Sequence, residues 1–164
     1  TMTDTPETAV RIRKMTDEDV SAAMEILDQW DMAPETDTDD AERSTIRVEN
    51  SFVAEADDTI VGVGSYIVHS ETLGETASLA VNPEYRGEGI GYRLQAARLE
   101  EMHDRGIETV RTETDRPETI EWYIEKFGYE RVGTNPKKHD FSLPDVDEWT
   151  VLKLNLAEWA ATRQ

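Results

Sequence analysis

The stretch VNPEYRGEGIGYRL, residues 81–94, decides the fold because three glycines stand at every second position directly before a helical pattern. The preceding segment, residues 75–81, has a strand pattern, so a strand leads into the glycines and a helix follows them. This arrangement aims backbone N–H groups and the positive end of the helix dipole at one point. Glycines let that backbone approach a bulky anion, and Arg86 adds a forked cationic donor. We therefore predict a pyrophosphate-binding loop.

Two well-known phosphate loops do not fit these glycines. The Walker pattern needs Gly-Lys-Ser/Thr, whereas Gly91 is followed by Tyr92 and an arginine. The dinucleotide-binding pattern, counted from the first two glycines, needs a third glycine where Tyr92 stands. What remains is the pattern Arg-x-x-Gly-x-Gly, formed by Arg86, Gly89 and Gly91.

The rest of the chain alternates between strand and helix patterns, with neither a repeat nor an interior linker. Strands are predicted over residues 9–15, 51–56, 59–70, 75–81, 107–114, 129–133 and 148–156. Helices are predicted over residues 20–30, 41–48, 90–105 and 117–127; Gly106 ends the third of these and Pro117 begins the fourth. In the third helix, Arg98 falls inside an otherwise apolar face. We expect one mixed α/β domain over residues 1–164.

The charge of the chain is unusual, because 36 acidic residues face 17 basic ones and give a formal net charge of −19 over 164 residues. Nucleic acid and anionic lipid surfaces repel such a protein, so we expect neither as a partner. The acidic residues are spread along the chain, with one local run, ETDTDD, at residues 35–40. The composition is similar to that of proteins from halophilic archaea, in which molar salt screens self-repulsion. An acidic mesophilic protein is the alternative.

Several kinds of site are disfavoured by what the sequence lacks. Cysteine is absent, which removes disulfides, thiolate nucleophiles and cysteine metal sites. His69, His103 and His139 lie far apart without ligand spacing, so no metal site is expected. No apolar run approaches the roughly 20 residues of a membrane span, and the first residues lack signal-peptide features, so we expect a cytoplasmic protein.

The glycine pattern resembles the coenzyme loop of the GCN5-related N-acetyltransferase (GNAT) superfamily, in which Arg-x-x-Gly-x-Gly follows a Val-x-Pro strand exit. The later segment ETIEWYIEKFGYERVG resembles the next helix and strand of that family, with Tyr123, Gly128 and Tyr129 at the places of its tyrosine and its Gly-Phe pair. The order of the expected elements also agrees over nearly the whole chain. The resemblance implies a GNAT fold, with a mixed central sheet of about six to seven strands flanked by helices. It also implies transfer of an acetyl group from acetyl-CoA to a primary amine.

The resemblance further implies which residues meet the coenzyme. The strand over residues 77–81 would offer backbone groups to the pantetheine arm, and the amides of residues 87–91 would hold the pyrophosphate. Arg116 stands where many relatives have asparagine, and it is a candidate contact to a coenzyme phosphate or to a carboxylate of the acceptor. The implied coenzyme-binding residues are Leu79, Ala80, Val81, Arg86, Gly87, Glu88, Gly89, Ile90, Gly91 and Arg116.

Two residues are the implied catalytic groups. In the family, the tyrosine at the place of Tyr123 lies near the coenzyme sulfur and can protonate the leaving thiolate. A glutamate six residues before the strand-end valine is the general base of one branch, and Glu75 stands there, with Glu71 and His69 as the reserve bases. A strand amide near Leu79 or the next residue would polarise the thioester carbonyl. The implied mechanism is direct attack by an amine, since no cysteine is available for a covalent intermediate.

The acceptor and the partners are the least determined by the sequence. The run ETDTDD lies where the acceptor-side loop of the family usually sits, which favours a cationic amine, either small or on a peptide or protein. The segment TNPKKHDFSLPDVDEW, residues 134–149, is predicted to be a long loop that closes over the acceptor or contacts a second copy, so a homodimer stays open. The missing asparagine leaves an alternative function open, a non-catalytic acyl-CoA-binding sensor or partner-binding module.

Overall fold

A seven-stranded mixed sheet forms the centre of the molecule, in the order β1-β2-β3-β4-β5-β7-β6. The structure is a computed structural model that describes residues 9–29, 47–137 and 145–163. Neighbouring strands are antiparallel except β4 and β5, which are parallel. The strands are β1 (Val10–Lys14), β2 (Ser51–Ala56), β3 (Thr59–Val68), β4 (Leu73–Val81), β5 (Thr109–Thr114), β6 (Glu130–Pro136) and β7 (Glu148–Asn155). This confirms the expected mixed α/β fold.

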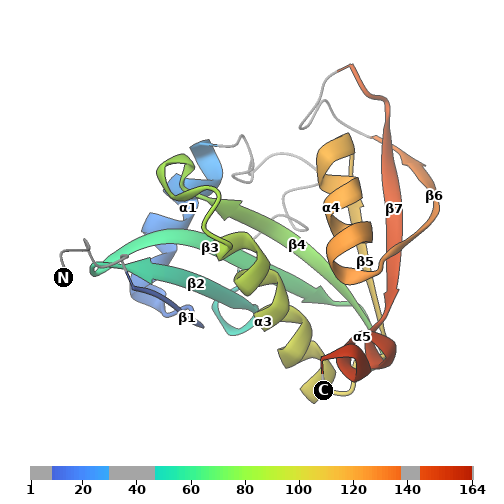
Figure 1. The fold of residues 1–164 in the computed structure, drawn as a ribbon, viewed down its shortest axis with the longest axis horizontal. Helices are drawn as coiled ribbons and strands as arrows, with labels where there is room; N and C mark the ends of the chain where they lie inside the picture. The colour runs from blue at the N-terminus through green and yellow to red at the C-terminus, as the bar shows by residue number, and fades with distance from the viewer. Residues whose placement is uncertain (1–8, 30–46, 138–144, 164) are drawn as a thin grey trace, which may run out of the picture.

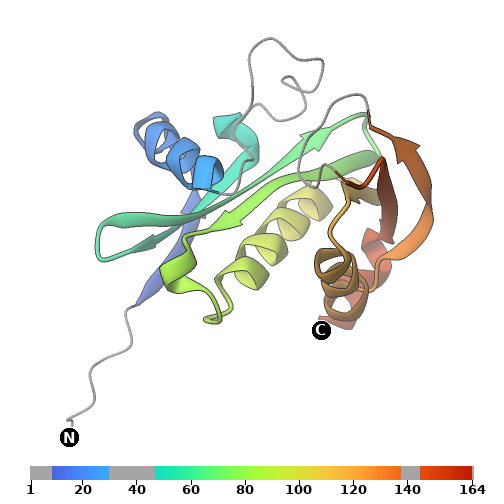
Figure 2. The same ribbon diagram turned by 90° about the horizontal axis from the view of Figure 1, so that it is seen from above.

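Helices cover both faces of the sheet. Helix α1 (Val20–Gln29) lies on one face, and α3 (Ile90–Asp104) and α4 (Pro117–Phe127) lie on the other, as Figure 1 and Figure 2 show. Helix α5 (Leu156–Thr162) follows β7 directly. Three short 3₁₀ turns, η1 (Asp17–Asp19), η2 (Val48–Asn50) and η3 (Pro83–Tyr85), complete the elements of the described residues. The last of these leads from β4 into the glycine loop.

The segment before β7 departs from the sequence prediction. The expected loop over residues 134–149 is wrong at its start, because β6 continues to Pro136, whereas β7 begins at Glu148 as the predicted strand over residues 148–156 does. Every residue of β6 is exposed, so this edge strand carries no apolar alternation that would mark its length. Proline is tolerated at the end of such an edge strand because its missing N–H faces no partner there.

The sequence prediction also missed helix α5. This helix begins after Asn155, whose side-chain oxygen accepts a hydrogen bond of 3.1 Å from the N–H of Glu158, and it buries Trp159. The helix expected over residues 41–48 lies outside the described residues, apart from Arg47 and Val48, and Val48 begins η2. The acidic run at residues 35–40 and the segment 138–144 also lie outside them.

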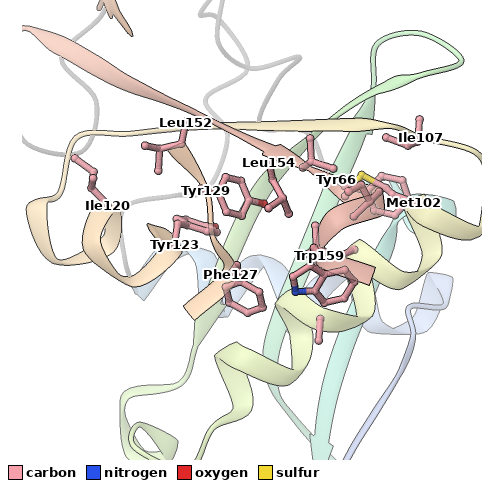
Figure 3. Packing of buried hydrophobic residues seen from close by; sticks show 14 residues of the cluster. Tyr66, Met102, Ile107, Ile120, Tyr123, Phe127, Tyr129, Leu152, Leu154 and Trp159 are labelled. Carbon is pink, nitrogen blue, oxygen red and sulfur yellow. The ribbon is translucent and has the colours of Figure 1, made fainter. Parts of the chain in front are cut away.

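A large apolar cluster fixes α4 against the sheet and against α5. Figure 3 shows Tyr123 and Phe127 of α4 pointing into this cluster, beside Tyr129 and Trp159. The ring centroids of Tyr123 and Tyr129 are 5.0 Å apart, and those of Phe127 and Trp159 are 6.5 Å apart. Aromatic packing of this kind contributes roughly 0.5–1.5 kcal/mol per pair beyond the buried area. It therefore holds the inner face of α4 in one place.

Candidate active site

The parallel strands β4 and β5 separate partway along their length. They are paired only over residues 73–75 of β4 and residues 109–111 of β5. Beyond Glu75, β4 continues beside β3, while β5 continues beside β7 as far as Thr114. The two strands therefore diverge toward their C-terminal ends, which Figure 1 shows for β4 and β5. Ligands of open α/β sheets bind at such carboxyl ends, where the strands part.

A pocket of about 620 Å³ fills this divergence. Such a volume is typical of a small-molecule site. Its lining comes from β4 (residues 75–81), the segment around the start of α3 (85–87 and 89–92), the end of β5 with the residues after it (112–116), α4 (118, 119, 122 and 123) and Trp149 of β7. The structure thus gathers the expected catalytic and coenzyme-binding residues around one pocket, with the exception of Glu88, which is not part of the lining.

The glycine loop presents bare backbone to the pocket. Gly87 and Gly89 have φ angles of 84° and 78°, in the left-handed region that side chains disfavour. A Cβ placed on either glycine would meet no atom within 4 Å, so it would project into open space. The first bond of the helical ladder joins the Arg93 N–H to the Gly89 carbonyl at 3.1 Å. The N–H groups of residues 90–92 lie ahead of that ladder, as an anion site at a helix N-terminus requires.

Two arginines line the pocket from different elements. Arg86 stands at the entrance to the glycine loop, and Arg116 is the residue before the first turn of α4. Both helices begin at the pocket, so two helix dipoles and two guanidinium groups favour negative charge there. The open cradle over the glycines and these two cations fit a ligand that carries several phosphates, such as the coenzyme expected from the sequence.

A β-bulge changes which residues of β4 face the pocket. From the pair Tyr66–Thr76 to the pair Gly64–Leu79, β4 advances by three residues whereas β3 moves by two. Before the bulge, Gly74 faces α3, because a Cβ there would lie 2.7 Å from the sulfur of Met102. After the bulge, Leu79 is on that face. The bulge interrupts the regular ladder between β3 and β4 beside the divergence.

Tyr123, the expected acid, lines the pocket from α4. Its side chain is only 3% exposed, yet it lines the pocket. Its hydroxyl accepts a hydrogen bond from the Nη2 of Arg98 at a distance of 3.4 Å. The residue therefore packs in the cluster of α4 and also lines the pocket.

Glu75 lies at the vertex of the divergence, in the last residue pair that joins β4 to β5. Its side chain is 5% exposed and its Oε1 lies 2.8 Å from the Nε2 of His69, whose side chain is 35% exposed. Because Gly74 faces α3, strand alternation turns Glu75 toward the opposite face. Tyr123 and Glu75 therefore approach the divergence from opposite faces of the sheet. Glu71 is exposed and is not part of the lining.

Two further buried carboxylates line the pocket and were missed by the sequence analysis. The side chains of Glu113 and Asp115 are 5% and 1% exposed. Glu113 is paired with Arg111, and Asp115 accepts a hydrogen bond of 2.6 Å from Lys137. Since Val110 of β5 belongs to the cluster beneath α4, the alternating odd-numbered residues face away from that helix, as Glu75 does. In the sequence, strand alternation places Glu113 and Asp115 on one face. It does not show that this face lines a pocket, because that depends on which strands lie beside β5.

The profile of the family named "Acetyltransferase (GNAT) family" matches residues 16–129 of the chain. The chain belongs to this family of acetyltransferase enzymes. The match begins at the residue before η1 and ends after α4, so it contains β4, the glycine loop and the expected acid. The resemblance inferred from the glycine loop is therefore confirmed, and so is the expected GNAT fold.

Known relatives agree with this assignment. The chain is 37% identical over 87 residues to N-alpha-acetyltransferase 30 of Schizosaccharomyces pombe, a match that covers 49% of the chain and 57% of that relative. The solved structure of Ard1 from Thermoplasma volcanium has a TM-score of 0.73 at 22% identity, with 90% of the chain and 97% of Ard1 covered. Rv2747 from Mycobacterium tuberculosis, solved in complex with CoA, has a TM-score of 0.66 at 20% identity, with 88% and 98% covered. These structural similarities establish the GNAT fold.

Of the helices within residues 9–29, 47–137 and 145–163, none is both long and apolar enough to span a membrane. In the same ranges, no group of three or more histidine, aspartate or glutamate side chains is arranged to hold a metal ion.

Proposed function

We propose that this chain transfers an acetyl group from acetyl-CoA to a primary amine by direct attack. The observation that carries the proposal is that Tyr123 and Glu75 line the same pocket at the divergence of β4 and β5. Membership in the acetyltransferase family supports it. Acetyl-CoA supplies an acetyl group activated as a thioester, with a thiolate as the leaving group.

The chain would hold the coenzyme through its backbone and two arginines. The amides at the start of α3 would bind the pyrophosphate, with Arg86 beside them and Arg116 reaching a phosphate from the opposite wall. Leu79, Ala80 and Val81 would offer backbone groups to the pantetheine arm, as extended strands bind peptide-like groups. An amide just after the bulge would donate a hydrogen bond to the thioester oxygen as negative charge develops there.

Two side chains would move the protons. Glu75 takes a proton from the acceptor ammonium, and the 2.8 Å contact with the half-exposed His69 gives that proton a route to solvent. The amine nitrogen then bonds to the acetyl carbon while the carbon–sulfur bond breaks. Tyr123 gives its proton to the departing sulfur, and the nitrogen loses its surplus proton to Glu75 or to water. The phenolate of Tyr123 regains a proton from solvent, so the net reaction converts an ammonium and a thioester into an amide, a thiol and one proton.

The acceptor would enter from the face that Glu75 occupies. Glu113 and Asp115 lie on the same side of β5, and their pairing with Arg111 and Lys137 makes this wall of the pocket polar with little net charge. The relative that is 37% identical over 87 residues is an N-alpha-acetyltransferase, so the α-amine of a peptide or protein is the first acceptor to test. A small amine is the second.

The net charge of −19 suggests the working conditions. We propose that the protein acts in a salt-rich cytoplasm, as in halophilic archaea, because ions at molar concentration screen repulsion among its acidic residues.

The function is tested by measuring thiol release from acetyl-CoA with a panel of peptide and small amines in molar KCl. An amine that accelerates thiol release and gains an acetyl group supports the proposal. Arg116 in place of the family asparagine favours one alternative, a module that binds acyl-CoA without using it. Tight binding of acetyl-CoA with no amine-dependent thiol release would establish that alternative and overturn the proposed enzyme.

A further inference from the structure

One cation lies buried beneath the pocket and outside its lining. Arg98, in the middle of α3, has no exposed surface. Its Nη1 donates hydrogen bonds to three backbone carbonyls, those of Ser65 at 2.8 Å, Ser78 at 3.2 Å and Ala77 at 3.4 Å. Ala77 and Ser78 are the residues of the bulge in β4. The guanidinium therefore ties α3 to the irregular part of the strand that lines the pocket.

The other end of the same guanidinium reaches the expected acid. Nη2 of Arg98 donates to the side-chain oxygen of Gln95 and, at 3.4 Å, to the hydroxyl oxygen of Tyr123. Gln95 in turn donates to the hydroxyl of Tyr129 at 2.9 Å. Burial raises the pKa of the Tyr129 hydroxyl well above its usual value, so this neighbour stays neutral. One planar group thus links the bulge of β4 with the hydroxyl on α4.

Within residues 9–29, 47–137 and 145–163, no carboxylate neutralises the charge of Arg98. Among the residues that the structure describes, no ion pair includes Arg98, and the acceptors of its hydrogen bonds are neutral oxygens. A buried cation of this kind is costly unless hydrogen bonds satisfy it, and it favours negative charge in its neighbourhood. Of the described groups that accept a hydrogen bond from Arg98, the hydroxyl of Tyr123 is the one that can become negative.

We propose that Arg98 is a positioning residue for Tyr123, which directs the phenolic proton into the pocket and stabilises the negative oxygen that remains when this proton leaves. A guanidinium only donates, so it occupies a lone pair of the Tyr123 oxygen and cannot accept the phenolic hydrogen. The phenolic hydrogen can therefore be donated to a group in the pocket. When the proton moves to the departing sulfur, the bond from Arg98 becomes charge-assisted on both sides and strengthens. This inference rests on the proposed function.

The test compares Arg98→Lys with Arg105→Lys. Lysine keeps the positive charge but lacks the planar fork, so it cannot donate hydrogen bonds to the β4 carbonyls and to Tyr123 at the same time. Arg105 is the matched control, because its Nη1 also donates to a tyrosine hydroxyl, that of Tyr66 at 2.9 Å, at the far end of α3. We expect Arg98→Lys to lower kcat about 10²-fold with little change in the Kd for acetyl-CoA, and Arg105→Lys to leave both near the parent values.

A double-mutant cycle separates positioning from general loss of structure. In the Tyr123→Phe background, Arg98→Lys should cost less than about 3-fold in kcat, because the hydroxyl it serves is already gone. An equal loss in both backgrounds would overturn the proposal. If Arg98→Lys does not fold, Gln95→Met is tested in its place. This variant keeps Arg98 and removes the Gln95 oxygen that accepts its hydrogen bond. An unchanged kcat in Gln95→Met would then overturn the proposal.

A second readout does not depend on activity. In protein labelled with ¹³Cζ-tyrosine, the Tyr123 resonance is identified by its loss in Tyr123→Phe. We expect Arg98→Lys to shift this resonance and Arg105→Lys to shift that of Tyr66 instead. A Tyr123 resonance unmoved by Arg98→Lys would contradict the contact itself. If the resonance moves but the parent protein transfers no acetyl group, the proposed function fails while the contact stands, and the catalytic part of the inference falls with the function.

Discussion

Replacing Gly89 by alanine is the sharpest test of the coenzyme loop. Gly89 and Gly106 stand at opposite ends of α3 and share one property, a left-handed backbone with φ angles of 78° and 92°. A Cβ at either would meet no atom within 4 Å. Gly89 lines the pocket and Gly106 does not. Gly106→Ala is therefore a matched control, with the same backbone strain and no effect on the pocket.

The two substitutions should cost similar stability and very different affinity. Holding an L-residue in the left-handed region costs about 1–2 kcal/mol, which lowers Tm by about 2–8 °C in a domain of this size. In Gly89→Ala the added methyl also projects over the amides that would bind the pyrophosphate. Loss of one hydrogen bond to a charged phosphate is worth about 1.5–3 kcal/mol, so the Kd for acetyl-CoA should rise about 10- to 150-fold.

Isothermal titration calorimetry with acetyl-CoA and thermal melting measure both quantities on the same samples. We expect weaker binding in Gly89→Ala and parent affinity in Gly106→Ala, with comparable falls in Tm. Parent affinity in Gly89→Ala would refute the loop assignment. An equal loss of affinity in Gly106→Ala would show that strain in α3, and not the blocked cradle, weakens binding.

Three further predictions concern the base, the salt and the acid sensitivity. Glu75→Gln should remove or shift the acidic limb of the pH–rate profile. An unchanged limb would mean that Glu75 is not the base and that His69 or Glu71 must be tested for that role. Tm should rise from about 0.1 M to about 2 M KCl, since the Debye length shrinks well below 10 Å, and a flat or falling curve would exclude the halophilic interpretation. The hydrogen bonds from Arg13 hold the pKa of Asp19 well below its usual range, so their stabilisation is present above about pH 4 and is lost as the pH falls. Asp19→Asn should therefore lower Tm at neutral pH, and a deficit that does not narrow in acid would contradict this pairing.

The glycine loop could be predicted because its information is local. The order of strand, arginine, glycines and helix is contiguous in the sequence, and it suffices to predict the left-handed glycines and the start of α3 that follows them. The same holds for α4, where proline begins the helix and Gly128, with a φ angle of 83°, ends it.

The rest of the site depends on pairings between distant segments. Arg98 was expected on a buried helix face, but its carbonyl partner at Ser65 lies 33 residues away and its tyrosine partner 25 residues away. His69 and Glu75 entered the sequence analysis as alternative bases, and only the turn between β3 and β4 brings them into contact. The sequence did not single out Glu113, because the strands beside β5, and not β5 itself, determine which face of β5 lines the pocket.

The most direct test of acetyl transfer at the divergence counts products of one reaction for the parent protein and Tyr123→Phe. Thiol released from acetyl-CoA and acetyl groups gained by a peptide amine are measured together in molar KCl, and the Kd for acetyl-CoA is measured separately. The parent should give one acetylated amine for each thiol. Tyr123→Phe keeps the ring and its packing, so it should bind acetyl-CoA normally and lower kcat by about 10- to 10⁴-fold. A parent that releases no thiol with any amine, or a Tyr123→Phe variant that turns over at the parent rate, would contradict the account.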